Sequence, residues 1–161
     1  MIAKKVLLVG NFGVGKTSLI RRFVLNEFSE EYISTIGVRV SSKVVTYENQ
    51  EIKLLIWDVA GTSGNEKIPK AYFLGASAAM FVFDVSRKET YLNINHHLAS
   101  VKELSGLQNI TIVGNKKDLL SEEELQTVIN TVSVKIDLIT SAKENDHVED
   151  AFLKLTAQAI K

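Results

Sequence analysis

The sequence predicts an α/β fold in which a six-stranded, mostly parallel sheet with one antiparallel strand carries about five helices on its two faces. Three observations support this prediction. Short apolar, β-branched segments alternate with segments whose apolar residues recur every three or four positions, a pattern typical of a sheet between two helical layers. Only residues 48–51 separate the second and third expected strands, too few for a helical crossover, so this pair is antiparallel. A glycine-rich turn joins the first expected strand to the first expected helix.

The expected strands are short runs of mostly apolar residues. They lie at residues 6–9, 38–47, 52–57, 78–84, 110–113 and 134–139. The first is apolar throughout and ends at Gly10, so we expect it to be buried on both faces of the sheet. Parallel strands present their carboxyl ends at one edge, where ligands bind in open α/β sheets. The loops that follow the strands are therefore the expected location of a site.

Apolar side chains at helical spacing predict the helices. They are Leu19, Ile20, Phe23 and Val24 in the first helix, and then Leu98, Val101 and Leu104, Leu125, Val128 and Ile129, and Val148, Phe152 and Leu155 in later ones. Start signals precede the three later helices. Ser86 with Glu89 and Ser121 with Glu124 resemble capping boxes, and Asp146 with Glu149 marks the expected beginning of the last helix.

The composition excludes several classes of protein. The chain has 161 residues and is expected to form one domain over residues 1–161. It contains no cysteine, which excludes disulfides, thiolate metal sites and cysteine nucleophiles within it. Because 19 basic residues balance 19 acidic ones, no nucleic-acid partner is expected. We recognise no transmembrane run, signal peptide or lipidation site, and so expect a cytoplasmic protein with no membrane anchor in this chain.

A phosphate-binding loop follows the first expected strand. Residues 10–17 read GNFGVGKT and match the pattern G-x-x-x-x-G-K-[ST]. The glycines allow successive backbone N–H groups to turn around a phosphate, and the following helix adds its positive N-terminal end. Lys16 can reach the β- and γ-phosphates, and the Thr17 hydroxyl can bind Mg²⁺. A chance match is the alternative, but a buried strand and an amphipathic helix flank the motif, as phosphate binding requires.

A second motif, residues 114–118 with the sequence GNKKD, follows the fifth expected strand. Asp118 suits the N1–H and exocyclic amine of guanine, a donor pair that adenine lacks. Lys116 offers its aliphatic stem to a base, and Asn115 can tie this loop to the phosphate loop. After the last strand, the backbone N–H of Ala142 can donate to guanine O6. Alone, such a tetrapeptide is more often a solvated turn, but its position in a chain with a phosphate loop favours base recognition.

Together these motifs resemble those of the small GTPases of the Ras superfamily, especially the Rab and Ras branches, over essentially all 161 residues. The resemblance implies a P-loop NTPase G domain that surrounds Mg²⁺ with GTP or GDP. The implied nucleotide-binding residues are Asn11, Phe12, Gly13, Val14, Gly15, Lys16, Thr17, Ser18, Phe28, Thr35, Gly61, Asn115, Lys116, Asp118, Ser141, Ala142 and Lys143. Phe28 stands where the family places an aromatic residue against the guanine edge, and an anchor in the core is the alternative role.

The resemblance also implies two switch loops, residues 30–40 and 58–74, which would bind effector, exchange-factor and GTPase-activating proteins. Thr35 would ligate Mg²⁺ through its hydroxyl and reach the γ-phosphate through its N–H. Asp58 would hold a Mg²⁺-bound water, and Gly61 would donate its N–H to the γ-phosphate. The implied metal ligands are Thr17, Thr35 and Asp58, and the implied catalytic residues are Lys16, Thr35, Gly61 and Thr62.

Two positions depart from the usual pattern of this family. Thr62 stands where most relatives have the glutamine that orients the attacking water, although the Rap-like branch also has threonine there. Phe12 stands where many Ras relatives have glycine, beside the path of an activating arginine finger. Both departures predict weak hydrolysis, and neither touches nucleotide binding. Asn65 could supply an amide from within the chain, but a polar turn is the interpretation that we favour.

Three functions follow from these observations. The first is a guanine-nucleotide-dependent switch that hydrolyses GTP slowly, and the second is a GTP-binding interaction module with negligible hydrolysis. The third, an adenine-specific P-loop kinase or ATPase, is disfavoured by Asp118 and by the lack of a lid or substrate-binding insertion. A single-turnover assay separates the first two functions, and competition of ATP against labelled GDP tests the third.

Overall fold

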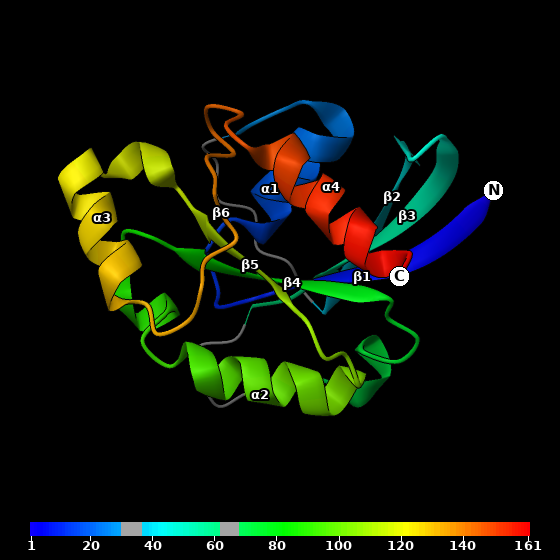
Figure 1. The fold of residues 1–161 in the computed structure, drawn as a ribbon, viewed down its shortest axis with the longest axis horizontal. Coiled ribbons are helices and arrows are strands. Elements are labelled where there is room, and N and C mark those ends of the chain that lie inside the picture. Colours follow the sequence, from blue (N-terminus) through cyan, green and yellow to red (C-terminus); the bar gives the residue numbers. More distant parts are fainter. Residues whose placement is uncertain (30–36, 62–67) are drawn as a thin grey trace.

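The sheet has six strands in the order β2-β3-β1-β4-β5-β6 (Figure 1). The computed structural model describes residues 1–29, 37–61 and 68–161. The strands are β1 (Ile2–Val9), β2 (Val38–Tyr47), β3 (Gln50–Val59), β4 (Ala78–Asp84), β5 (Thr111–Asn115) and β6 (Leu138–Ile139). Strand β2 runs antiparallel to β3, and the other paired strands are parallel. The predicted mostly parallel sheet with one antiparallel strand is thereby confirmed.

Four α-helices occur in the described part of the chain, where about five were expected. They are α1 (Lys16–Leu25), α2 (Ile94–Ser105), α3 (Glu122–Thr131) and α4 (Val148–Ala159). Three short 3₁₀ turns, at Lys70–Tyr72, Lys88–Thr90 and Lys117–Leu119, complete the helical elements. Between β3 and β4 the described residues contribute only the first of these turns, which accounts for the smaller number.

Helices cover both faces of the sheet, and each face has its own apolar core. Figure 1 shows α1 and α4 on one face and α2 on the other. Because side chains alternate along a strand, β1 supplies Val6 and Leu8 to the core under α1 and α4, and Leu7 and Val9 to the core under α2. Strand β4 is buried at all of its positions, as expected for a central strand of a sheet covered on both faces.

The expected capping boxes differ in outcome. The box at α3 is confirmed: the Ser121 hydroxyl accepts from the Glu124 N–H at 3.2 Å, and the Glu124 carboxylate accepts from the Ser121 N–H at 3.0 Å. The box of Ser86 with Glu89 is wrong, because the N–H and hydroxyl of Ser86 both donate to the carboxylate of Asp84. Helix α2 begins only at Ile94.

Two further boundaries were predicted wrongly. Asp146 does not begin the last helix, because its carboxylate pairs with Lys117 at 2.6 Å, and α4 starts at Val148. The last strand was expected over residues 134–139 but covers only Leu138–Ile139. The strand begins late because the Asp137 carboxylate accepts the N–H of Ile112 that a longer parallel ladder would use. None of the described helices has both the length and the apolar character needed to cross a membrane.

Candidate functional site

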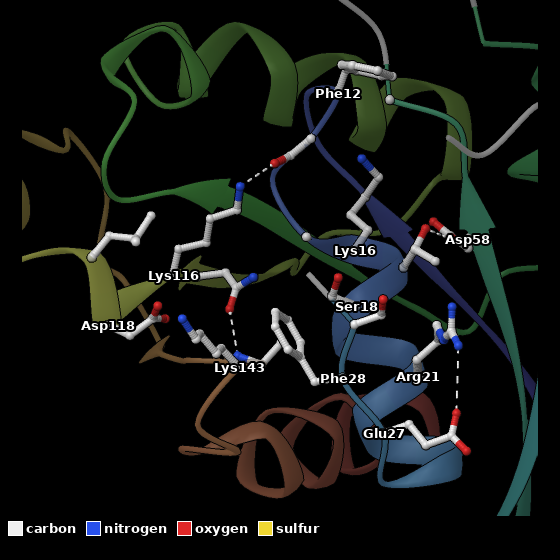
Figure 2. Close-up of a pocket in the computed structure, with 18 residues that line it drawn as sticks. Phe12, Lys16, Ser18, Arg21, Glu27, Phe28, Asp58, Lys116, Asp118 and Lys143 are labelled. Carbon is white, nitrogen blue, oxygen red and sulfur yellow. Dashed lines mark hydrogen bonds and ion pairs between the residues drawn. The ribbon is translucent and has the colours of Figure 1, made fainter. Parts of the chain in front are cut away.

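The loops after the parallel strands meet around one cavity of about 290 Å³. Figure 2 shows that its side chains come from the phosphate loop and α1, the segment after α1, the end of β3 and the loops after β5 and β6. The lining residues are Phe12, Gly13, Gly15, Lys16, Thr17, Ser18, Arg21, Glu27, Phe28, Ser29, Asp58, Gly61, Asn115, Lys116, Asp118, Leu119, Ala142 and Lys143. The tertiary structure thus brings most of the predicted site residues of the described part together.

Not every predicted residue lines this cavity. Asn11, Val14 and Ser141 lie next to its lining residues in the sequence without contributing to the wall themselves. Val14 and Ser141 are both fully buried. Val14 packs in the core beneath the loops, whereas the Ser141 hydroxyl supports the wall by a hydrogen bond to Asp118. Thr35, Thr62 and Asn65 lie outside the described residues.

Glycine is needed in the phosphate loop at the positions where the backbone turns and neighbours approach closely. Gly15 has φ 102°, and a Cβ at this position would lie 2.3 Å from the side-chain nitrogen of Asn115. Gly10, with φ 148°, would bring a Cβ to 2.1 Å from the carbonyl oxygen of Val82. Because glycine has no Cβ and tolerates positive φ, it allows the loop to adopt this path between β1 and α1.

Lys16 is folded back over the loop from which it projects. Its ammonium group donates to the carbonyl oxygens of Gly10 at 2.9 Å and Asn11 at 3.0 Å. Burial lowers the pKa of Lys16 to about 8, while the carboxylate of Asp58 raises it and Arg87 lowers it further. An anion in the cavity would favour the charged form of this lysine.

Thr17 and Asp58 place two hard oxygen donors side by side. The Thr17 hydroxyl, in the first turn of α1, donates to the carboxylate of Asp58 at 2.5 Å. Asp58, near the end of β3, is 1% exposed, and both residues line the cavity. Mg²⁺ prefers oxygen ligands and is commonly held by one or two protein side chains together with phosphates and waters. This donor set fits such a cation.

The end of β5 and the loop that follows it are tied to the phosphate loop by two side chains. Asn115 donates to the carbonyl oxygen of Val14 at 3.1 Å, the contact expected from the sequence. The Lys116 ammonium donates to the carbonyl oxygen of Gly13 at 2.7 Å, and its stem lies along the cavity wall (Figure 2). The side-chain oxygen of Asn115 accepts from the N–H of Ala142 at 3.3 Å, which also links the loop after β6.

Asp118 and Phe28 lie at the end of the cavity away from Lys16, as Figure 2 shows. The Ser141 hydroxyl donates to Asp118 at 2.7 Å and holds that carboxylate in place. Phe28 lines the cavity and also packs against the core between the sheet and α4. Its position is therefore compatible both with contact to a base and with a role as an anchor in the core. A planar group between Phe28 and Lys116 would face the Asp118 carboxylate.

Gly61 and Phe12 meet at the opposite end. A Cβ at Gly61 would lie 2.5 Å from the backbone nitrogen of Phe12, so only glycine fits there. The Phe12 side chain lines the cavity and is 45% exposed, an unusual exposure for a large aromatic group.

Sequence reasoning missed several residues around the cavity. Arg21 and Glu27 both line it and form a 3.7 Å ion pair with each other. Arg21 lies four residues after Thr17, and this helical spacing could have placed it on the same face. Arg87, in the loop after β4, donates to the carbonyl oxygen of Phe12 at 2.7 Å. Because ligands bind after the carboxyl ends of parallel strands, the loop after β4 was an expected site segment. No sequence motif, however, indicated a role for its arginine.

Comparison with known proteins supports the same interpretation. The sequence profile of the Ras family matches residues 5–161. The chain is 37% identical over 161 residues to Ras-related protein RABA2d of Arabidopsis thaliana, and the alignment covers 96% of this chain and 73% of that protein. It is 36% identical over 160 residues to Ras-related protein YPTC6 of Chlamydomonas reinhardtii, with 96% of this chain and 74% of that protein aligned. It is 35% identical over 156 residues to Ras-related protein Rab-4A of Danio rerio, with 93% of this chain and 73% of that protein aligned.

Proposed function

The chain belongs to the Ras family of small GTPases, and from that premise we propose that its cavity binds Mg²⁺ with GTP or GDP and that it hydrolyses GTP slowly. The observation that carries this proposal is the convergence of three groups on one cavity. Lys16 of the phosphate loop, Asp58 at the end of β3 and Asp118 after β5 all line it. Phosphate, metal and base recognition thus occupy successive parts of one wall.

The phosphate end of the cavity contains groups that attract an anion. Lys16 and the N-terminus of α1 face it, and both favour a polyphosphate. Thr17 and Asp58, joined by their 2.5 Å hydrogen bond, would hold Mg²⁺, with Thr35 as a third ligand from outside the described residues. When bound, the cation neutralises charge on the β- and γ-phosphates.

The base end favours guanine. The Asp118 carboxylate can accept from N1–H and the exocyclic amine together, and Ser141 fixes its orientation. Phe28 and the stem of Lys116 supply apolar faces on either side of a ring. Adenine lacks the donor pair, so a carboxylate at this position would be left with its hydrogen bonds unmade, which is costly.

Hydrolysis requires water to attack the γ-phosphorus while the bond from that phosphorus to the β-phosphate oxygen breaks, releasing GDP and phosphate. Lys16 would stabilise the charge that develops on the phosphate oxygens. Gly61 would donate its N–H to the γ-phosphate, from a backbone that already lies against Phe12. Thr35 would order the first switch, and Thr62 would face the attacking water.

We propose slow turnover because two residues at the reaction centre, Thr62 and Phe12, are poorly suited to assist hydrolysis. The Thr62 hydroxyl is shorter than the glutamine side chain that orients water in most relatives. Phe12 lies at the mouth of the cavity, 45% exposed, where it would crowd an arginine finger entering beside the phosphate loop. The same exposed phenyl ring favours a second candidate function, a GTP-binding interaction module with negligible hydrolysis. Asn65 remains a candidate water-orienting residue from the second switch.

The proposed switch loops are residues 30–40 and 58–74, and they would be the surface for effector, exchange-factor and GTPase-activating proteins. Gly61 belongs to the second loop and lines the cavity, so a change at the γ-phosphate can reach that loop directly. Hydrogen exchange of both loops, with GDP and with a non-hydrolysable GTP analogue, measures this response. Equal protection in the two states would contradict the switch and leave nucleotide binding untouched.

The experiment for the whole proposal starts with the nucleotide carried by the purified protein. We expect GDP or GTP, displacement of labelled GDP by unlabelled GDP and GTP, and no displacement by ATP. Single-turnover hydrolysis then separates the two candidate functions, since a switch converts bound GTP slowly and an interaction module leaves it intact. Competition by ATP as strong as that by GTP would contradict the assignment of the base pocket.

A further inference from the structure

We propose that Arg87, which lies outside the family's nucleotide-binding motifs considered above, is a positioning residue of the phosphate loop that holds the Phe12–Gly13 peptide with its N–H directed at the bound phosphates. The inference rests on the proposed function of the cavity. Each backbone carbonyl group of the loop requires a hydrogen-bond partner.

Every carbonyl oxygen from residue 10 to residue 15 has a partner in the described structure. The first two accept from the Lys16 ammonium, and that of Gly15 accepts from the N–H of Leu19 at 2.9 Å within α1. The remaining three accept from side chains at or just after the carboxyl ends of β4 and β5. These are Phe12 from Arg87 at 2.7 Å, Gly13 from Lys116 at 2.7 Å and Val14 from Asn115 at 3.1 Å.

These three contacts form a consecutive series. Arg87 belongs to the loop after β4, Asn115 is the last residue of β5, and Lys116 begins the loop that follows β5. In a planar trans peptide the N–H points away from the C=O. A side chain that binds a carbonyl oxygen from outside therefore turns the N–H of the next residue to the opposite side. By this geometry Arg87 directs the N–H of Gly13, and Lys116 directs that of Val14, towards the cavity.

Arg87 is itself held in place by a buried carboxylate. Asp84 is 1% exposed and lies 3.2 Å from the Arg87 Nε and 3.1 Å from the Lys116 ammonium. The other oxygen of Asp84 accepts from the N–H and hydroxyl of Ser86, at 2.8 and 2.6 Å. Thr90 closes the same loop by accepting the N–H of Asp84 at 2.9 Å. One buried acid thus orients both cations that bind the phosphate loop.

The guanidinium group is suited to this task. Its planar fork lets one nitrogen face Asp84 while another donates to Phe12, which the single ammonium of a lysine cannot reproduce with the same geometry. A charged donor also polarises the peptide that it binds, making the Gly13 N–H a stronger donor to an anion. Arg87 acts on the nucleotide through the backbone, so it is a positioning residue and not a catalytic one.

The test compares Arg87→Met, which keeps the stem, with Arg87→Lys, which keeps the charge. Lys88→Met is the matched control, because Lys88 is the exposed neighbour in the same loop. We expect GDP to dissociate about tenfold faster from Arg87→Met, the scale of one lost hydrogen bond to a charged group. The rate of GDP dissociation from Arg87→Lys should lie between those of Arg87→Met and the parent, and the rate from Lys88→Met should equal that of the parent.

A spectroscopic measurement separates positioning from general stability. In the GDP complex, Arg87→Met should shift the amide proton of Gly13 more than that of Val14, whereas Lys116→Met should do the reverse. Thermal unfolding of the GDP-free variants measures any loss of fold. If the parent retains GDP but Arg87→Met neither speeds its release nor moves the Gly13 amide, this inference is wrong and the proposed function stands. A parent that fails to bind GDP would overturn the proposed function itself.

Discussion

Gly61 lies so close to Phe12 that a Cβ at position 61 would come within 2.5 Å of both the nitrogen and the Cα of Phe12. The start of the second proposed switch and the phosphate loop are therefore in backbone contact, on the side of the cavity where a γ-phosphate would lie. Thr62 follows Gly61 directly in the sequence, and we propose that residues 12 and 62 both act on the hydrolysis step. Changes at these two positions should not act independently.

The first prediction concerns hydrolysis. Ras without an activating protein hydrolyses GTP at about 4 × 10⁻⁴ per second, and we expect this protein to be no faster than that order. Thr62→Gln alone should raise turnover only a few-fold, because Phe12 remains. Thr62→Gln combined with Phe12→Gly should exceed the product of the single effects, since residues that share one transition state couple.

Single-turnover measurements on the parent, the two single variants and the double variant check this prediction. Strict additivity would mean that Phe12 does not crowd the γ-phosphate. A parent rate near one per second would mean that another group, such as Asn65, orients the attacking water.

The second prediction concerns base selectivity. Asp118→Asn should weaken GDP binding by about 2 kcal/mol or more, because a charge-assisted bidentate contact is lost. Preference should move towards xanthine nucleotides, whose 2-oxo group accepts from the new amide. Competition binding with GDP and XDP measures both effects. Glu122→Gln, which removes an exposed carboxylate at the start of α3, is the control, and unchanged GDP affinity in Asp118→Asn would refute the base assignment.

The third prediction concerns the metal. Thr17→Asn should weaken Mg²⁺-dependent nucleotide binding, with GTP affected more than GDP, because the hydroxyl beside Asp58 is lost. Thr17→Ser retains a hydroxyl and should behave like the parent. Nucleotide affinity measured with Mg²⁺ and with a chelator gives the metal-dependent part. If the asparagine variant responds to Mg²⁺ as the parent does, Thr17 is not a ligand.

The fourth prediction concerns protons. Burial lowers the pKa of Lys16 to about 8 in the free protein, and bound phosphates favour its charged form, which raises that pKa. Below pH 8 Lys16 is charged in both the free and the nucleotide-bound protein, so its titration should not make the nucleotide affinity depend on pH. Above pH 8 binding must take up a proton, so affinity should fall as the pH rises.

Calorimetry in two buffers with different ionisation enthalpies measures this proton uptake directly. At pH 8.5 GDP binding should take up a fraction of a proton, and at pH 6.5 almost none from this source. The uptake should vanish in Lys16→Met. Equal uptake in parent and variant would assign the proton to another group.

Local chemistry explains which predictions from the sequence succeeded. The phosphate loop could be recognised because its glycines, lysine and threonine act within eight consecutive residues. The capping box of Ser121 with Glu124 succeeded for the same reason, since both hydrogen bonds join residues three apart. Ser86 failed because Asp84, two residues earlier, takes both of its donors. Competition between neighbouring acceptors cannot be resolved from a motif alone.

The amino-acid sequence by itself determined the alternation of strands and helices and the antiparallel β2–β3 pair, and it predicted most of the residues that line the cavity. Periodicity and short motifs encode these features, because they depend on neighbours along the chain. Only the tertiary structure decided that Arg87 reaches Phe12, 75 residues away, and that the buried Asp84 orients both Arg87 and Lys116. Such contacts depend on which strand ends lie side by side and on where a carboxylate is excluded from water. Packing across the whole sheet sets both.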